Sequence, residues 1–144
     1  MITARDVMHA KAQCISEEQT LLEAAKMMEK MGVGALPICG SDQKLKGIIT
    51  DRDIVVRCIA KGKDPATMKA MDLGGHLHCV RADDTMEMVL KKMKDHQIRR
   101  IPVIDNEKLV GMISEADLAA GHMMGKGLTD QMIVDFMDGV YAKR

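Results

Sequence analysis

The chain is poor in aromatic residues: its 144 residues include no tryptophan, one phenylalanine and one tyrosine. Proteins that bind single-stranded nucleic acid stack the bases on aromatic rings, and this sequence has almost none to offer. Lysine plus arginine and aspartate plus glutamate number 21 each, so the formal net charge at pH 7 is zero. Without a global positive field, we expect no nucleic-acid partner.

Long apolar runs are also missing. No segment approaches the roughly 20 apolar residues that a membrane-spanning helix needs. The N-terminal stretch MITARDVM lacks the apolar region of a signal peptide. We therefore expect a cytoplasmic protein with no membrane partner, in which most cysteines are thiols. The four cysteines are Cys14, Cys39, Cys58 and Cys79.

Apolar residues make up 47% of the chain and charged residues 29%, a balance typical of globular proteins. A chain of this length can bury a core without disulfides or metal. Its fifteen methionines predict a core filled by flexible thioethers in place of rings. The alternative, a methionine-rich surface for metal or peptide, would require the methionines to cluster on one exposed face.

One short pattern occurs twice, as GIITDRDIV at residues 47–55 and as GMISEADLA at residues 111–119. Each copy has a glycine, an apolar pair, a hydroxyl residue and, three residues later, an aspartate. The apolar pair predicts the end of a buried strand, and the hydroxyl is placed to cap a following helix. The hydroxyl and acidic residues are Thr50 with Asp53 and Ser114 with Asp117.

The repetition extends upstream, because Pro37 matches Pro102 and each proline run follows an amphipathic helical stripe. Each copy predicts the order strand, helix, strand, strand, helix, giving an α/β fold. We expect Pro37 at a strand edge or start rather than in a central strand. The expected domains are residues 1–64, residues 65–122 and a tail, 123–144. The tail predicts one more amphipathic helix, with Thr129 as its N-cap.

These stretches resemble CBS domains, the cystathionine-β-synthase type of regulatory module, from about residue 2 to residue 122. Two successive copies resemble a stand-alone pair, or Bateman module. ARDVM, GALPICG, TDRDIV and EADL also resemble the bacterial hypoxic-response type of pair. The resemblance implies two pseudo-symmetric units and a regulatory function, linked to stress responses. It also implies binding of an adenine nucleotide such as AMP or ATP, or of an adenosyl ligand, in clefts between the copies.

The resemblance assigns roles to particular residues. Asp53 and Asp117 would accept hydrogen bonds from the ribose hydroxyls. A phosphate would lie at the helix N-terminus, near the hydroxyl of Thr50 or Ser114. The remaining assignments are the base-flanking residues Ala35 and Ile101 and the phosphate-contacting cations Arg99 and Arg100. The alternative is a capping box that needs no ligand. Because Ala116 in the second copy replaces Arg52 of the first, we expect two unequal sites.

Cysteine and histidine positions suggest a second kind of site. In a CBS fold, the strand ends that carry Cys14 and Cys39 come close, so a disulfide or a shared metal is a candidate. The alternative is two small buried thiols. His96 and His122 lie at predicted helix C-termini, where histidine often only complements the helix dipole. The alternative is a zinc site, assembled across a dimer.

Catalytic motifs are missing: there is no nucleophile elbow, no Walker loop and no dinucleotide fingerprint. We therefore expect no enzyme, but a homodimer that signals to an effector protein. The dimer is expected because the helical stripes and the tail carry more apolar surface than two units can cover. The competing hypothesis is a structural, redox-responsive or metal-responsive dimer without nucleotide binding.

Overall fold

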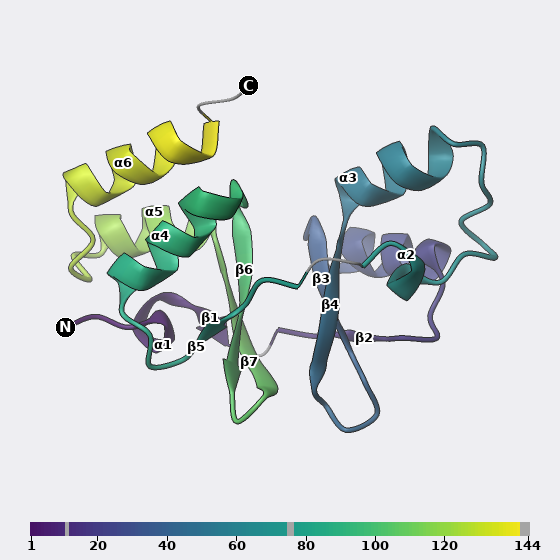
Figure 1. Cartoon of the computed structure of the whole chain (residues 1–144), viewed down its shortest axis with the longest axis horizontal. Helices are drawn as coiled ribbons and strands as arrows, with labels where there is room; N and C mark the ends of the chain where they lie inside the picture. Colours follow the sequence, from purple (N-terminus) through teal and green to yellow (C-terminus); the bar gives the residue numbers. More distant parts are fainter. Residues whose placement is uncertain (11, 75–76, 142–144) are drawn as a thin grey trace. The chain divides into compact units, whose positions relative to one another are not determined.

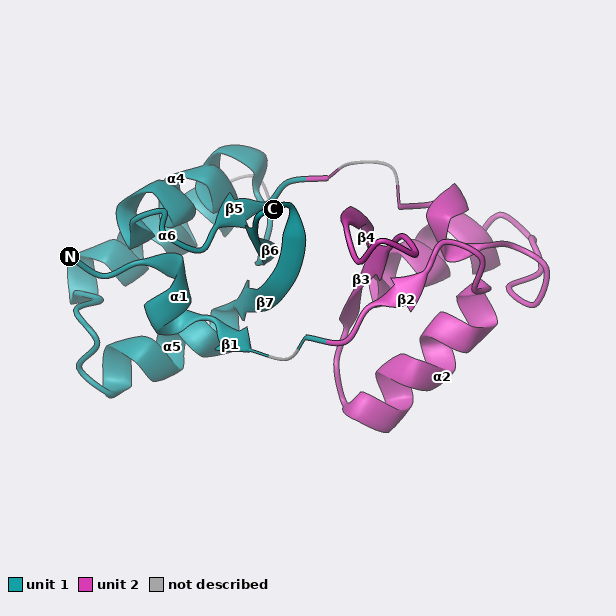
Figure 2. Cartoon of the chain, turned by 90° about the horizontal axis from the view of Figure 1, so that it is seen from below, with its two compact units in different colours: residues 1–12, 78–144 teal, residues 13–77 magenta. Residues whose placement is uncertain are grey.

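The computed structural model describes residues 1–10, 12–74 and 77–141, and the chain forms two compact units (Figure 2). One unit comprises Gln13–Leu77, and the other comprises Met1–Ala12 together with His78–Arg144. These boundaries differ from the repeat boundaries expected at 1–64, 65–122 and 123–144. The N-terminal segment belongs to the unit of the second repeat, and residues 65–77 belong to the unit of the first.

The first repeat forms a three-stranded sheet in the order β2-β3-β4. Strand β2 pairs in parallel with β3, and β3 pairs antiparallel with β4 (Figure 1). Helix α2 begins after Thr20, whose hydroxyl accepts the N–H of Glu23, and ends at Gly32 in the left-handed conformation. The elements are β2 (Ile15–Ser16), α2 (Leu21–Met31), β3 (Ala35–Cys39), β4 (Leu45–Thr50), α3 (Asp51–Asp53), the π-helix η1 (Ile54–Ile59) and the 3₁₀-helix η2 (Ala70–Asp72).

The second repeat has the same succession of elements, and the N-terminal strand β1 extends its sheet to the order β1-β7-β6-β5. Strand β1 pairs antiparallel with β7. The elements are α1 (Ala4–Val7), β1 (His9–Ala10), β5 (Val80–Arg81), α4 (Met86–His96), β6 (Arg100–Asp105), β7 (Lys108–Ser114), α5 (Glu115–Met123) and α6 (Asp130–Tyr141). The predicted α/β fold and the tail helix are thus confirmed.

The short segments that lead into the two repeats are exchanged between the units. Ala4, at the start of ARDVM, is fully buried in the core of the second repeat's unit. Ala70, at the start of AMDLG, is fully buried in the core of the first repeat's unit. The backbone N–H of Ala4 donates to the carbonyl of Asp84, and that of Ala70 donates to the carbonyl of Gln19. The core of each unit therefore includes the short segment that precedes the other repeat in the sequence.

Most of each helical stripe is buried inside its own unit. Met28 of α2 and Met86 and Met93 of α4 lie in the cores, so methionine does replace aromatic rings there. Phe136 of α6 is 2% exposed and packs in the same core as α4. The tail helix starts as predicted, with the Thr129 hydroxyl accepting the N–H of Met132 at 3.1 Å. Met31 at the end of α2 and Met137 of α6 are 37% and 42% exposed, so part of the apolar surface cited for dimerisation stays accessible.

The expectation for Pro37 was wrong, since this proline lies within β3, the central strand of its sheet. The reason is that β2 is short. It pairs only with Ile38 and Cys39, so beside Pro37 the strand has a neighbour on one side only. A proline is tolerated where a strand has an open side. Among the described residues, no helix has the length and apolar character needed to cross a bilayer.

Candidate functional site

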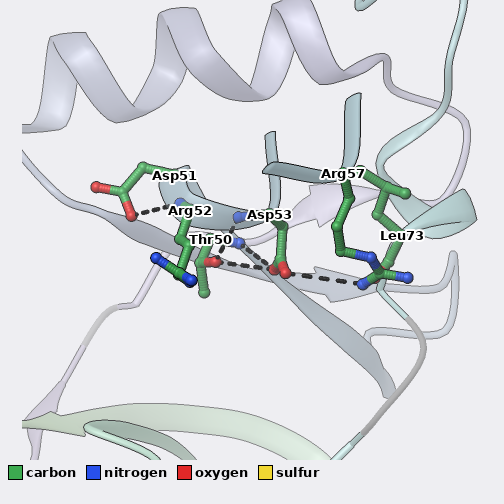
Figure 3. Close-up of polar contacts among 6 residues, drawn as sticks. All are labelled: Thr50, Asp51, Arg52, Asp53, Arg57 and Leu73. Carbon is green, nitrogen blue, oxygen red and sulfur yellow. Dashed lines mark hydrogen bonds and ion pairs between the residues drawn. The ribbon is translucent and has the colours of Figure 1, made fainter. Parts of the chain in front are cut away.

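Thr50 and Asp53 form a reciprocal pair where β4 ends and α3 begins (Figure 3). The N–H of Asp53 donates to the Thr50 hydroxyl oxygen at 3.1 Å. In return, the N–H and the hydroxyl of Thr50 donate to Oδ2 of Asp53, at 3.0 and 2.8 Å. This is the capping box that the motif predicts.

The second copy of the motif has the same geometry. The N–H and hydroxyl of Ser114 donate to Oδ2 of Asp117, at 2.8 and 2.9 Å. In both copies the cap uses a single carboxylate oxygen, and Oδ1 takes no part in it. A carboxylate oxygen can accept more than one hydrogen bond. The cap therefore leaves Oδ1 of each aspartate outside its hydrogen bonds.

The neighbouring strand brings the other predicted residues to the same sheet end. Ala35 pairs with Thr50, and Arg100 pairs with Ser114. The first copy thus has the methyl group of Ala35 where the second has the guanidinium of Arg100. Arg99, the residue before Arg100, is partly buried. Ile101 is fully buried in the core, so its side chain leaves no surface for a base.

An arginine that the motif did not point to lies beside Asp53. Nη1 of Arg57 is 3.7 Å from Oδ1 of Asp53 and donates to the carbonyl of Leu73 at 2.7 Å (Figure 3). Arg57 belongs to the π-helix η1, whereas the second copy continues as the regular helix α5. A π-helical turn is rare and is frequent at functional sites. The i, i+4 spacing from Asp53 was the sequence signal for this pair.

A histidine takes the corresponding place beside Asp117. Nδ1 of His9 lies 2.8 Å from Oδ2 of Asp117, the oxygen that also serves the cap. The side chains of Asp53 and Asp117 are 26% and 18% exposed. Asp53 thus lies beside an arginine and Asp117 beside a histidine. Nothing local in the sequence predicts the His9 contact, because it depends on β1 pairing with a strand a hundred residues away.

Cys14 and Cys39 are in contact as free thiols. Burial raises the pKa of Cys39 to about 12, and the hydrogen bond with the Cys14 thiol contributes to the rise. The predicted proximity of the two sulfurs is therefore present, although they are not bonded to each other. Cys58 is buried elsewhere and its thiol donates to the carbonyl of Lys63 at 3.4 Å.

The two candidate zinc ligands have separate partners. The ring of His96 stacks on that of His78, with ring centres 3.7 Å apart. Nδ1 of His122 lies 2.6 Å from the carbonyl oxygen of Leu128, and Nε2 lies 2.9 Å from Oδ1 of Asp130. In the described part of the chain, no three histidine, cysteine or acidic side chains are grouped to hold a metal.

Comparison with known proteins gives relatives of closely similar length. Over 141 residues the chain is 42% identical to Hypoxic response protein 1 of Mycobacterium tuberculosis, covering 97% of this chain and 94% of that protein. It is 36% identical to the CBS domain-containing protein YhcV of Bacillus subtilis over 123 residues, which is 85% of this chain and 87% of that protein.

Solved structures agree with this relationship. The crystal structure of Hypoxic Response Protein I with two coordinated zinc ions matches with a TM-score of 0.77 and 46% identity, covering 82% of this chain and 97% of that one. CBSX2 in complex with AMP has the same fold, with a TM-score of 0.74, 20% identity and coverage of 88% and 99%. The CBS domain family matches residues 4–59 and 74–121. The chain therefore belongs to the CBS domain family and is a regulatory module built from a pair of CBS domains.

Proposed function

We propose that this CBS pair is a non-catalytic sensor that binds an adenine nucleotide or adenosyl ligand and transmits its occupancy to an effector protein. The observation that supports the proposal best is the duplicated hydroxyl and carboxylate pair. In both copies the carboxylate is fixed through Oδ2 by its cap, while Oδ1 is not needed for capping. A rigid, partly buried acceptor at a helix N-terminus suits a ribose with a phosphate attached.

The cationic residues differ between the two sites, and this difference predicts unequal affinities. At the second site, Arg100 pairs with Ser114, so a guanidinium lies near the helix N-terminus where a phosphate would bind. At the first site, the equivalent Ala35 offers no charge, Arg57 contacts the carboxylate, and Arg52 of α3 has an exposed side chain. A ligand with several phosphates should therefore prefer the second site. AMP held by the fold relative CBSX2 is consistent with a ligand of this class.

Isosteric changes of the two aspartates test the proposal. In Asp53→Asn and Asp117→Asn, the remaining oxygen can still accept the cap hydrogen bonds, but an NH₂ group replaces Oδ1 and cannot accept from ribose. Calorimetry with AMP, ADP, ATP, S-adenosylmethionine and NAD should show weaker binding at the changed site by at least roughly tenfold. Thermal melting without ligand is the control for an intact cap. Equal affinity in both variants and the unchanged protein would refute the proposed role.

The alternative function, a redox-responsive or metal-responsive dimer, is supported by other residues. Cys14 and Cys39 already touch, and the related Hypoxic Response Protein I holds two zinc ions. His122 shares one feature with zinc ligands, because its Nδ1 lies on a backbone carbonyl that fixes the ring. Its Nε2, the nitrogen that would bind zinc, lies beside the carboxylate of Asp130.

Two measurements test the alternative. Mild oxidation should remove two titratable thiols, and reductant should restore them, in the unchanged protein but not in Cys14→Ala. Zinc retained after dialysis should be lost when His96 and His122 are both changed to alanine. Four titratable cysteines after oxidation, together with no retained zinc, would dispose of this alternative.

A further inference from the structure

The only tyrosine of the chain, Tyr141, touches both segments that flank the candidate site of the second repeat. Its ring faces the guanidinium of Arg99, whose Cζ lies 5.8 Å from the ring centre. Its hydroxyl donates to Oε1 of Glu115. Arg99 directly precedes β6 and Glu115 is the first residue of α5, so one side chain links the two segments.

The sheet register explains why a single ring can reach both partners. Arg100 of β6 pairs with Ser114 of β7. The residues next to this pair, Arg99 and Glu115, therefore lie at the same end of the sheet, where the helix α5 begins. The N-terminus of that helix is the place where the proposed ligand phosphate would bind.

Helix α6 is firmly held in the unit, so the position of Tyr141 is fixed by more than its own contacts. Phe136 and Val140 are 2% and 6% exposed and belong to the same core as Leu90 of α4. Tyr141 follows Val140 directly and is partly buried. An arginine stacked on such a ring has lost side-chain freedom before any ligand arrives, which favours binding.

The first repeat has no counterpart of this arrangement. By strand register, Gly34 stands where the second repeat has Arg99, and Asp51 stands where it has Glu115. Within residues 60–74, as far as the structure describes them, η1 leads into the segment that carries η2, and no helix equivalent to α6 occurs there. Tyr141 therefore distinguishes the second site from the first.

We propose, on the basis of the proposed nucleotide function, that Tyr141 is a positioning residue of the second site. It holds Arg99 ready for a ligand phosphate, so binding at this site depends on the docking of α6. The first site does not share this dependence. The ring is the essential part of Tyr141, and the hydroxyl fixes its orientation through Glu115.

Calorimetry on the full chain tests the inference. All variants also carry Asp53→Asn, which weakens ligand binding at the first site, so that the measured binding reports on the second site. Tyr141→Leu should weaken ATP binding by about three- to tenfold, because it removes the stacking partner of Arg99. Tyr141→Phe keeps the ring and should bind ATP nearly as well as the background. Arg99→Gln should reproduce the loss without altering α6, and adding Tyr141→Leu to it should cause little further loss.

Adenosine, which has no phosphate, separates positioning from a general structural role. If Tyr141 acts through Arg99, adenosine should bind the Tyr141→Leu variant and its background equally well. Equal losses for ATP and adenosine, or unchanged ATP binding in Tyr141→Leu, would overturn the inference while leaving the proposed function in place. If neither ATP nor adenosine binds the unchanged protein, the inference fails, and the proposed function fails with it only if AMP, ADP, S-adenosylmethionine and NAD do not bind either.

Discussion

Gly139 of α6 lies directly against the side chain of Lys94 of α4. A Cβ atom added at Gly139 would overlap Cγ and Cδ of Lys94. The two helices can approach this closely because position 139 has no side chain. Their contact buries Phe136 and Val140, so a glycine that is otherwise unfavourable within a helix is required here by packing.

Gly139→Ala should therefore destabilise the protein, although the same change in an exposed helix normally stabilises it by about 0.5–1 kcal/mol. Urea unfolding would measure the effect. The matched control is the same change in a Lys94→Ala background, where the space is free and the helix preference for alanine should prevail. An equal effect of Gly139→Ala in the two backgrounds would contradict the packing explanation.

The reciprocal cap at Thr50 predicts different costs for two changes of Asp53. Asp53→Ala removes the acceptor for the N–H and hydroxyl of Thr50 and should lower the free energy of unfolding by about 0.5–2 kcal/mol. Asp53→Asn retains an oxygen at the position of Oδ2 and should cost clearly less. Denaturant titrations of both variants without ligand decide the point. Equal costs would mean that the charge of Asp53, and not its cap geometry, stabilises the fold.

The raised pKa of Cys39 predicts a loss of stability at alkaline pH. The folded protein keeps this thiol neutral up to about pH 12, whereas the ordinary thiol pKa is 9.0. Between these pH values Cys39 keeps its proton in the folded state but loses it in the unfolded state. The contribution of this thiol to the free energy of unfolding is therefore complete below about pH 9 and is lost as the pH rises towards 12. From about pH 8 to about pH 10.5, the unchanged protein should lose more stability than Cys39→Ala.

Cys14→Ala provides the control for this pH effect. Burial is the larger cause of the shift and the contact with Cys14 the smaller one. Removing Cys14 should therefore reduce the alkaline loss without abolishing it. If Cys39→Ala and the unchanged protein lose stability in parallel, the thiol of Cys39 is not held neutral by the fold.

Homodimerisation remains a prediction, but the structure moves its expected surface to η1. Val55 and Ile59 of this helix are 58% and 54% exposed, and among the described elements none packs on η1 as α6 packs on α4. We expect Ile59→Glu to convert a dimer to a monomer in light scattering at micromolar concentration. Met88→Glu, on α4 and similarly exposed at 56%, should leave the dimer intact. A monomeric unchanged protein, or equal effects of both changes, would contradict this surface.

Local signals in the sequence were enough for most of the fold. The repeated motif predicted the strand ends at Thr50 and Ser114 and the caps that follow, because capping depends on residues only three apart. Helical periodicity predicted α2, α4 and α6 for the same reason. The closeness of Cys14 and Cys39 was expected from the family resemblance, which places the ends of their strands near each other.

Apart from the i, i+4 pair of Asp53 and Arg57, the missed contacts depend on distant pairings. His9 reaches Asp117 only because β1 joins the sheet of the second repeat. Tyr141 reaches Arg99 and Glu115 only because α6 packs on α4. When the two repeats are aligned, the segment before each repeat is assigned to the repeat that follows it. The sequence pattern therefore did not predict that Ala4 and Ala70 each pack in the unit of the other repeat.

The exchanged leads have a consequence for the order in which the protein acquires its structure during synthesis. The unit Gln13–Leu77 is one continuous segment, so a ribosome releases all of it before the second repeat is finished. Strand β1 is made earlier still, but its partner β7 is among the later elements to emerge. Strand β1 therefore stays unpaired until β7 has been synthesised, whereas the unit Gln13–Leu77 can fold before then.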